Sequence, residues 1–113
     1  MKLQTIIYTP EMDRAVEWYS QVLNTEAVYR SDVWSSFTVG DAKLAIHRSD
    51  NQPNDSRAQL SLVATETLED ISDRLTSSQI AIHRGIQEET FGRSLLLKDP
   101  DGFAVQVNEH EVR

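Results

Sequence analysis

A glutamine stands in the middle of an otherwise apolar strand in the segment KDPDGFAVQV, residues 98–107. The turn formers D-P-D-G predict a tight turn, and the alternation after them predicts a strand. Val105 and Val107 then share one face, while Gln106 lies on the other. A carboxylate at this position would suit a metal ion, whereas an amide both donates and accepts hydrogen bonds. Gln106 therefore favours hydrogen-bonding chemistry.

His47 and several aromatic residues are further candidates for contact with a ligand. An imidazole can exchange a proton or bind a metal ion, and Tyr8, Trp34 and Phe37 could stack on an aromatic ligand. Alternation puts Trp34 and Phe37 on opposite faces of a regular strand. Each residue also has an ordinary structural explanation, because strand aromatics are more often part of a core and a single histidine is a weak signal.

Two cations near the last hairpin, Arg93 and Lys98, could bind an anionic group. The plainer explanation is a solvated strand edge that resists aggregation, and we favour it. The chain contains no Walker-type glycine loop, no G-x-G-x-x-G, no G-x-S-x-G and no H-E-x-x-H. Nucleotide-binding, hydrolase and metalloprotease functions therefore have no support from motifs.

The composition excludes other classes of function. The 113 residues carry 18 acidic and 11 basic side chains, a formal charge of −7, which argues against a nucleic-acid partner. The chain has no cysteine, which excludes disulfides, thiolate nucleophiles and cysteine-bound metals. Its apolar runs are far too short for a signal peptide or a membrane span, so we expect no membrane partner and a cytoplasmic location.

The elements that must position these residues follow a pattern in the first half of the chain. Leu3–Tyr8 is rich in β-branched and aromatic residues and predicts a strand. Thr9 could cap a following helix with Pro10 at its first position, and Asn24 could end that helix. The apolar stripe of this helix would contain Met12, Ala15, Val16, Tyr19, Val22 and Leu23. Short strands are then expected over residues 26–30, 33–39 and 43–48.

The second half repeats the order after SDNQPNDS, residues 49–56, whose turn formers indicate a connector. Leu60–Val63 predicts a strand, and Thr67 with Asp70 suggests a capping box at the start of a helix. The stripe of this helix would contain Leu68, Ile71 and Leu75. Strands are then expected over residues 80–86, 93–98 and 103–107.

The pattern is therefore βαβββ twice, an α+β fold in one domain, residues 1–113. Module one would span residues 1–48, the connector 49–56 and module two 57–113. One such module cannot cover its own amphipathic sheet, so two should combine. Each would be a curved mixed sheet with a helix on its outer face, and the two would form a cleft suited to a ligand.

With this duplicated order of elements, the chain resembles the vicinal oxygen chelate superfamily. That superfamily includes glyoxalase I, bleomycin- and fosfomycin-resistance proteins and extradiol dioxygenases. The resemblance rests on the helix segment RAVEWYSQVLN, on the half-length repeat and on DPDGFAVQV, where the family shows a D-P-D-G turn before the last strand. It covers essentially the whole chain. It implies two modules around a cleft, and it implies a homodimer, because family members commonly pair.

The resemblance also implies where a metal ion would bind in metal-using members, at four cleft-facing strand positions. Here these positions hold Gln4, Gln59, Gln106 and, depending on register, Ala45 or His47. Glu109 lies three residues beyond Gln106 and so belongs to the opposite face. Because a neutral amide oxygen is a poor ligand for a divalent ion and no carboxylate is present, the quartet argues against a metal.

We therefore expect a glyoxalase/bleomycin-resistance-like protein that binds a small organic molecule in a metal-free cleft, with no cofactor. The expected contact residues are Gln4, His47, Gln59, Gln106, Tyr8 and Trp34. The alternative is a divalent-metal-dependent lyase, isomerase or dioxygenase-like enzyme, with an ion on Gln4 and His47 acting as a Lewis acid. A third hypothesis is a module that acts only through protein contacts. Whether the chain catalyses a reaction stays open at this point.

Overall fold

The computed structural model describes residues 4–50, 60–90 and 92–110. The chain divides into two compact units, unit 1 up to Asp55 and unit 2 from Ser56. Each unit contains a four-stranded mixed sheet and one helix, in the order βαβββ. The predicted α+β fold with two βαβββ modules is therefore confirmed. Most of the predicted connector, residues 51–56, lies outside the described residues.

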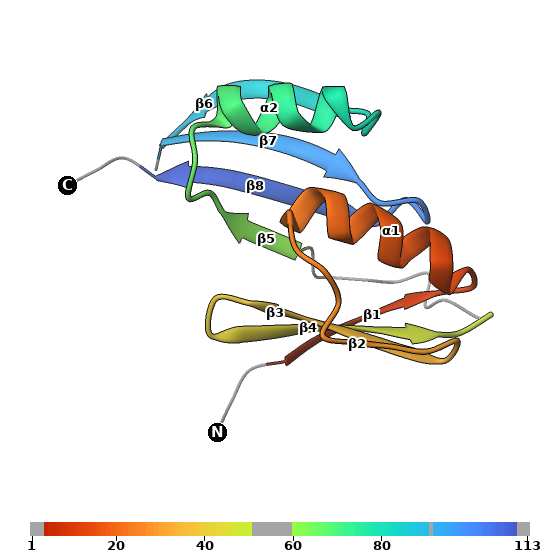
Figure 1. Cartoon of the computed structure of the whole chain (residues 1–113). Coiled ribbons are helices and arrows are strands. Elements are labelled where there is room, and N and C mark those ends of the chain that lie inside the picture. The colour runs from red at the N-terminus through yellow and green to blue at the C-terminus, as the bar shows by residue number, and fades with distance from the viewer. Residues whose placement is uncertain (1–3, 51–59, 91, 111–113) are drawn as a thin grey trace. The chain divides into compact units, whose positions relative to one another are not determined.

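Unit 1 is a mixed sheet in the order β1-β4-β3-β2 (Figure 1). Its first strand runs parallel to β4, and the other pairs are antiparallel. A parallel pair needs a crossover, which is supplied here by the helix and the two intervening strands. The elements are β1 (Gln4–Thr9), α1 (Met12–Leu23), β2 (Tyr29–Arg30), β3 (Trp34–Val39) and β4 (Ala42–Arg48).

One face of the unit 1 sheet packs against α1 through β3 and β4. The buried residues on this face and on the helix include Ile7, Phe37, Leu44, Ile46, Met12, Ala15, Val16, Tyr19 and Val22. The strand register puts the remaining side chains on the opposite face, which we call the helix-free face of unit 1. It carries Gln4, Ile6, Tyr8, Tyr29, Trp34, Ser36, Ala45 and His47.

The start of α1 differs from the prediction, in which Thr9 capped a helix beginning at Pro10. Thr9 is the last residue of β1, and its carbonyl accepts a hydrogen bond from Ser49 N at 2.9 Å. Its hydroxyl accepts from Glu11 N at 3.1 Å, which forms a turn ahead of the helix. Because Thr9 belongs to the sheet, the helix begins two residues later, with Glu11 at the N-cap position.

The other end of α1 was predicted correctly. Asn24 adopts the left-handed conformation, with φ 53° and ψ 44°. Thr25 N donates to Ser20 O at 3.1 Å, as in a Schellman-type helix end. The expected strand over residues 26–30 is shorter than predicted, because only Tyr29 and Arg30 join the ladder as β2. Residues 25–28 connect the end of α1 to β2, which is the edge strand of the sheet.

Unit 2 repeats the arrangement, in the sheet order β5-β8-β7-β6 with β5 and β8 parallel. Figure 1 shows α2 lying across one face of this sheet. The elements are β5 (Leu60–Val63), α2 (Leu68–Ser77), β6 (Arg84–Glu89), β7 (Gly92–Lys98) and β8 (Ala104–His110).

No helix among the described residues of either unit is long and apolar enough to span a membrane.

The core of unit 2 lies between α2 and one face of its sheet. Its fully or nearly buried apolar residues include Leu68, Ile71, Leu75, Leu95, Leu97, Val105 and Val107. The strand register puts the alternate residues on the helix-free face of unit 2. This face carries Ser61, Val63, Ser94, Leu96, Gln106 and Asn108.

The ends of α2 explain one correct and one wrong prediction. Thr67 is the N-cap, and its hydroxyl accepts from Asp70 N at 3.1 Å, as predicted. The strand expected over residues 80–86 begins only at Arg84. Ile80 N instead donates to Leu75 O at 2.8 Å, and Gln79 has φ 64°, so these residues close the helix in a Schellman-type end. The apolar periodicity of residues 80–86 did not reveal that the backbone N–H of Ile80 bonds to the end of α2 and is therefore not available to a strand.

Candidate functional site

Three of the residues singled out in the sequence form one cluster on the helix-free face of unit 1. Tyr8 is the parallel partner of His47, and Trp34 is its antiparallel partner. The ring centroid of His47 lies 5.7 Å from that of Tyr8 and 5.7 Å from that of Trp34. The predicted opposition of Trp34 and Phe37 is also observed, since Phe37 is fully buried on the helix side. We call Tyr8, Trp34 and His47 the aromatic cluster.

The aromatic cluster is accessible and has neighbours of mixed character. The side chain of Tyr8 is 41% exposed, and Ile6 beside it is 40% exposed. Tyr29 belongs to the same face because it pairs with Ser36, and sequence reasoning did not single it out. Its aromatic type was visible, but only the short β2 ladder decides which way it points. The face therefore combines exposed rings with the hydroxyl of Ser36.

The register of β1 and β4 separates Gln4 from His47. Gln4 pairs with Lys43, four positions before His47. At the usual rise per strand residue this is about 13 Å along the strands. One ion cannot be held by two ligands at that separation, since metal-ligand bonds are about 2 Å long. The residue between them on the same strand face is Ala45, which has no donor atom.

The donor chemistry of the described residues does not fit a divalent ion either. No group of three or more His, Asp or Glu side chains that could hold a metal lies among residues 4–50, 60–90 and 92–110. Gln4 and Gln106 offer neutral amide oxygens, and Gln59 lies outside the described residues. Glu109 turns to the helix side of unit 2, where it accepts a hydrogen bond from Leu68 N at 3.0 Å. The described residues at these positions are therefore suited to hydrogen bonding and not to binding a divalent ion.

Gln106 lies on the helix-free face of unit 2, opposite Ser61 on β5 and Leu96 on β7. Val105 and Val107 beside it are buried on the helix side, which is the orientation that the alternation predicts. Gln106 is half-buried, and β8 lies between β5 and β7 in the sheet. Its part in ligand binding stays a prediction, as does that of Gln4.

Asn108 follows two residues later on the same face, and sequence reasoning did not single it out. It is only 7% exposed. Its Nδ2 donates to Ser61 Oγ at 2.7 Å, whereas its Oδ1 is buried and has no hydrogen-bond partner in the described part of the chain. The even spacing from Gln106 was the signal that could have found it, because residues two apart share a strand face.

A compact polar network occupies the neighbouring strands of this face. Arg84 Nη2 donates to Ser94 Oγ at 3.0 Å, and Ser94 Oγ donates to Glu89 Oε1 at 2.9 Å. Gln87 Nε2 donates to the same carboxylate at 2.7 Å. The hydrogen bonds from Gln87 and then Ser94 lower the pKa of Glu89 from its ordinary value. The network therefore keeps Glu89 ionised and holds Arg84 in place.

Arg93, one of the two cations considered for an anionic ligand, is occupied on the helix side of unit 2. It forms a two-pronged pair with Glu69 of α2, with N–O distances of 2.6 and 2.8 Å. Its Nε also donates to Glu109 at 2.8 Å. The bonds from Arg93 lower the pKa of Glu69 to about 2. This guanidinium joins α2 to the sheet and is not aimed at a ligand.

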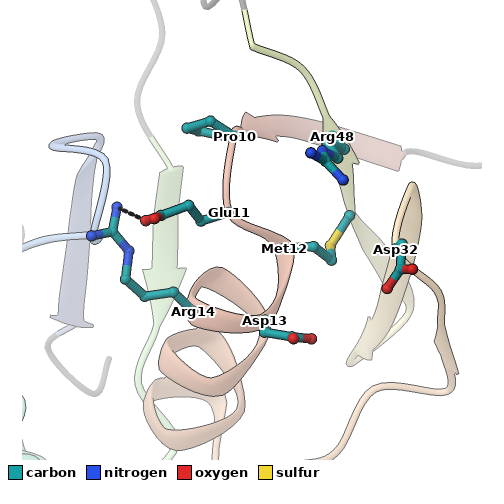
Figure 2. A pocket seen from close by; sticks show the side chains of 7 residues that line it. All are labelled: Pro10, Glu11, Met12, Asp13, Arg14, Asp32 and Arg48. Atoms are coloured by element: carbon teal, nitrogen blue, oxygen red, sulfur yellow. Dashed lines mark ion pairs between the residues drawn. The ribbon is translucent and has the colours of Figure 1, made fainter.

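A pocket of about 330 Å³ lies at the start of α1 (Figure 2). Its acidic and basic side chains are mixed, and Glu11 pairs with Arg14 within it at 2.8 Å. None of the residues in the aromatic cluster lines this pocket, and none of its lining residues is aromatic. It therefore offers no clear preference for one sign of ligand charge. The lining residues are Pro10, Glu11, Met12, Asp13, Arg14, Asp32 and Arg48.

The D-P-D-G segment, residues 99–102, is a turn that is stabilised by hydrogen bonds from backbone N–H groups to its own first side chain. Asp99 is nearly buried, and its Oδ1 accepts from Asp101 N at 2.9 Å and from Phe103 N at 2.8 Å. Gly102 has φ 86°, a conformation that favours glycine. The turn sets the start of β8 and so the position of Gln106 and Asn108.

Comparison with known proteins agrees with this architecture. Residues 3–107 match the profile of the Glyoxalase/Bleomycin resistance protein/Dioxygenase superfamily. The phenazine antibiotic resistance protein EhpR of Enterobacter agglomerans is 25% identical over 111 residues, which cover 90% of this chain and 86% of that protein.

Solved structures share the fold at lower identity. Lactoylglutathione lyase from Agrobacterium tumefaciens superimposes with a TM-score of 0.75 and 20% identity, over 96% of this chain and 92% of that one. TioX from Micromonospora sp. ML1 gives a TM-score of 0.77 and 17% identity, over 98% of this chain and 99% of that one. With the profile matching almost the whole chain, this protein belongs to the Glyoxalase/Bleomycin resistance protein/Dioxygenase superfamily.

Proposed function

We propose that this protein binds a planar aromatic small molecule by stacking on the aromatic cluster, without a metal ion. The observation that carries the proposal is the placement of Tyr8, Trp34 and His47 side by side on the helix-free face of unit 1. Stacked rings contribute about 0.5–1.5 kcal/mol per pair beyond the burial of their surface. Exposed rings that a core would normally bury are thus available to a ligand ring.

Charge and polarity narrow the class of ligand. The chain carries a net charge of −7, which favours a neutral or cationic molecule over an anion. The cluster itself contains a polar ring, the imidazole of His47, and Ser36 lies two residues from Trp34 on the same face of β3. Such groups orient a ligand, while the rings supply most of the contact area.

One relative supports this class of ligand. EhpR is named as a phenazine antibiotic resistance protein, and a phenazine is a planar three-ring heteroaromatic compound. Capture of such a compound requires no reaction and no metal, which agrees with the donor chemistry of Gln4 and Gln106. A metal-dependent lyase, isomerase or dioxygenase-like activity gains no comparable support from the described residues.

The test is titration with unsubstituted phenazine, followed by calorimetry and by tryptophan fluorescence. The chain has two tryptophans, and Trp18 lies on α1 against Tyr19. A Trp18→Phe variant leaves Trp34 as the reporter and should bind as the native chain does, with its fluorescence quenched. Trp34→Leu should weaken binding roughly tenfold. Absence of phenazine binding to the native chain would refute the proposal, and equal binding by Trp34→Leu would refute the assigned surface.

We further propose a homodimer in the cytoplasm. Val28, Tyr29 and Val33, beside the edge strand β2, are each more than half exposed, and such apolar edges tend to associate. The lack of cysteine suits a reducing compartment. Light scattering of the eluting protein should give twice the mass of 12.9 kDa, and a monomer at micromolar concentration would contradict the dimer.

A further inference from the structure

The pocket at the start of α1, which we call the α1 pocket, is held in shape by hydrogen bonds within unit 1. Its lining comes from the residues after β1, the first turn of α1, the segment before β3 and the end of β4 (Figure 2). Ser49 N donates to Thr9 O at 2.9 Å, and Arg48 N donates to Val33 O at 3.0 Å. Because these backbone bonds join β4 to both neighbouring segments, the walls of the α1 pocket are formed before a ligand enters.

Three of the charged side chains that line the α1 pocket are already paired within the chain. Glu11 and Arg14 form an ion pair at 2.8 Å, which Figure 2 marks with a dashed line. Asp13 pairs with Arg30 of β2 at 3.0 Å. These three side chains therefore have partners without a ligand.

The other two charged side chains, those of Asp32 and Arg48, are available. They have opposite charges and line the same pocket, yet they do not pair with one another. Neither side chain has a hydrogen-bond or ion-pair partner among the residues that the structure describes, and both residues are exposed. An exposed ion pair contributes little to stability, so folding does not require the two to be joined. They offer one cationic and one anionic group to a molecule that enters the pocket.

The α1 pocket also has an apolar part of suitable size for a small molecule. Pro10 and Met12 line it beside the two available charges, and Met12 is only 6% exposed. A methionine side chain adapts its shape to what it contacts. The volume of about 330 Å³ lies at the lower end of the range for small-molecule sites, about 300–1,000 Å³. The ligand should therefore be small and carry both charges and an apolar group.

We propose that the α1 pocket is a second binding site, which takes a free α-amino acid with an apolar side chain. The guanidinium of Arg48 binds the carboxylate of the ligand through two parallel hydrogen bonds, and the carboxylate of Asp32 accepts from its ammonium group. The apolar side chain of the ligand packs against Met12 and Pro10. This site goes beyond the proposed function and does not depend on it, because its ligand needs no aromatic ring.

The first measurement is a titration of the ¹⁵N-labelled native chain with leucine and with methionine, up to about 10 mM, followed by amide NMR signals. Saturable shifts are expected for the amides of Met12, Asp32 and Arg48. Absence of saturable shifts with both amino acids would overturn the proposal. Shifts confined to other parts of the chain would overturn the assigned pocket.

The second measurement tests whether the native chain requires both ligand charges. Isocaproate has the side chain and carboxylate of leucine without its ammonium group, and isoamylamine has the side chain and the amine without the carboxylate. Each should bind at least about tenfold more weakly than leucine, because each loses one set of charge-assisted hydrogen bonds. Affinities equal to that of leucine would show that the apolar group alone is bound, and would overturn the proposal.

The third measurement assigns the two charges to residues. Asp32→Asn and Arg48→Gln should each weaken leucine binding about tenfold. Asp41→Asn and Lys43→Gln make the same changes of net charge at exposed residues outside the α1 pocket, so these matched controls should bind as the native chain does. Equal weakening by test and control variants would mean that only the overall charge matters, and would overturn the proposal.

Thermal unfolding checks that each variant is folded before its affinity is measured. Should Asp32→Asn or Arg48→Gln not fold, the comparison of leucine with isocaproate and isoamylamine decides the matter, because it uses the native chain alone. Binding of leucine without binding of phenazine would leave this proposal standing and refute the proposed function. The reverse result would refute this proposal alone.

Discussion

Tyr8 and His47 are direct partners in the parallel pair of β1 and β4, with ring centroids 5.7 Å apart and ring planes at 73°. The edge of one ring thus meets the face of the other, a favoured geometry for aromatic pairs. Trp34 approaches His47 from the antiparallel partner strand at the same centroid distance of 5.7 Å. His47 is therefore the central ring of the cluster, and its role can be tested separately from that of its neighbours.

Replacing His47 by alanine should weaken binding of phenazine about three- to tenfold, because it removes the ring that both neighbours contact. His47→Phe keeps a ring and should retain most of the affinity, which distinguishes stacking from proton transfer. Calorimetry gives the dissociation constants. His83, an exposed histidine outside the cluster, provides the matched control as His83→Ala. Equal weakening by alanine and phenylalanine at position 47 would contradict a stacking role.

Divalent ions should not stabilise the protein. Gln4 and His47 lie about 13 Å apart along their strands, and the expected metal positions among the described residues, at Gln4, Ala45 or His47, and Gln106, carry no carboxylate. Thermal unfolding with added nickel, zinc, manganese or iron(II) should therefore give an unchanged midpoint. A rise in the midpoint that disappears in His47→Ala would instead support the metal-dependent alternative, because binding to the folded state alone is stabilising.

Stability should fall in acid partly through Glu69. Arg93 lowers the pKa of Glu69 from 4.5 to about 2 in the folded state. A depressed pKa gives a contribution to the free energy of unfolding that is complete above the ordinary value, and it is lost as the pH falls toward the folded value. The window is thus from about pH 5 down to pH 2.

The measurement is urea unfolding of the native chain, Glu69→Gln and Arg93→Gln across this window. Each variant should be less stable at neutral pH and should lose less stability on acidification than the native chain. The double variant should lose no more of the pH dependence than either single one, because both members belong to one pair. A native acid dependence retained in full by Glu69→Gln would contradict this assignment.

The turn before β8 should depend on the Asp99 carboxylate. Asp99→Ala removes the acceptor for two backbone N–H groups, those of Asp101 and Phe103, and should cost about 2 kcal/mol of unfolding free energy. Asp99→Asn keeps one acceptor oxygen in the same place and should cost clearly less. The midpoint of urea unfolding gives both values. Equal losses for alanine and asparagine would mean that the charge, and not the acceptor geometry, is what matters.

Much of the fold was predictable because its signals are local. The stripe Ala15, Val16, Tyr19 and Val22 is buried as its spacing predicts, because the repeat of a helix brings these positions to one side. Asn24 ends α1 and Thr67 begins α2, since each residue acts on backbone groups within its own turn. The wrong element boundaries fall where a residue could belong to either of two consecutive elements. Thr9 ends β1 and does not cap α1, and Ile80 belongs to the end of α2 and not to the next strand.

The candidate site was predictable only in part. Strand alternation correctly separated Trp34 from Phe37 and placed Gln106 opposite its valine neighbours. Alternation assigns a face, but it does not say how far along that face two strands are offset. Gln4 and His47 share a face, yet they are not neighbours, and that fact depends on the pairing of β1 with β4 across some forty residues of chain.

By itself, then, the sequence determined the order of elements, the helix faces, the turn at Asp99 and the lack of carboxylates at the expected metal positions, because each is a matter of residue type or local spacing. Only the tertiary structure decided the strand registers. Those registers gather Tyr8, Trp34 and His47, move Gln4 away from them and leave one oxygen of Asn108 without a donor among the residues that the structure describes. The physical reason is that hydrogen-bonded pairing between distant strands is set by the packing of the whole sheet, which no local pattern encodes.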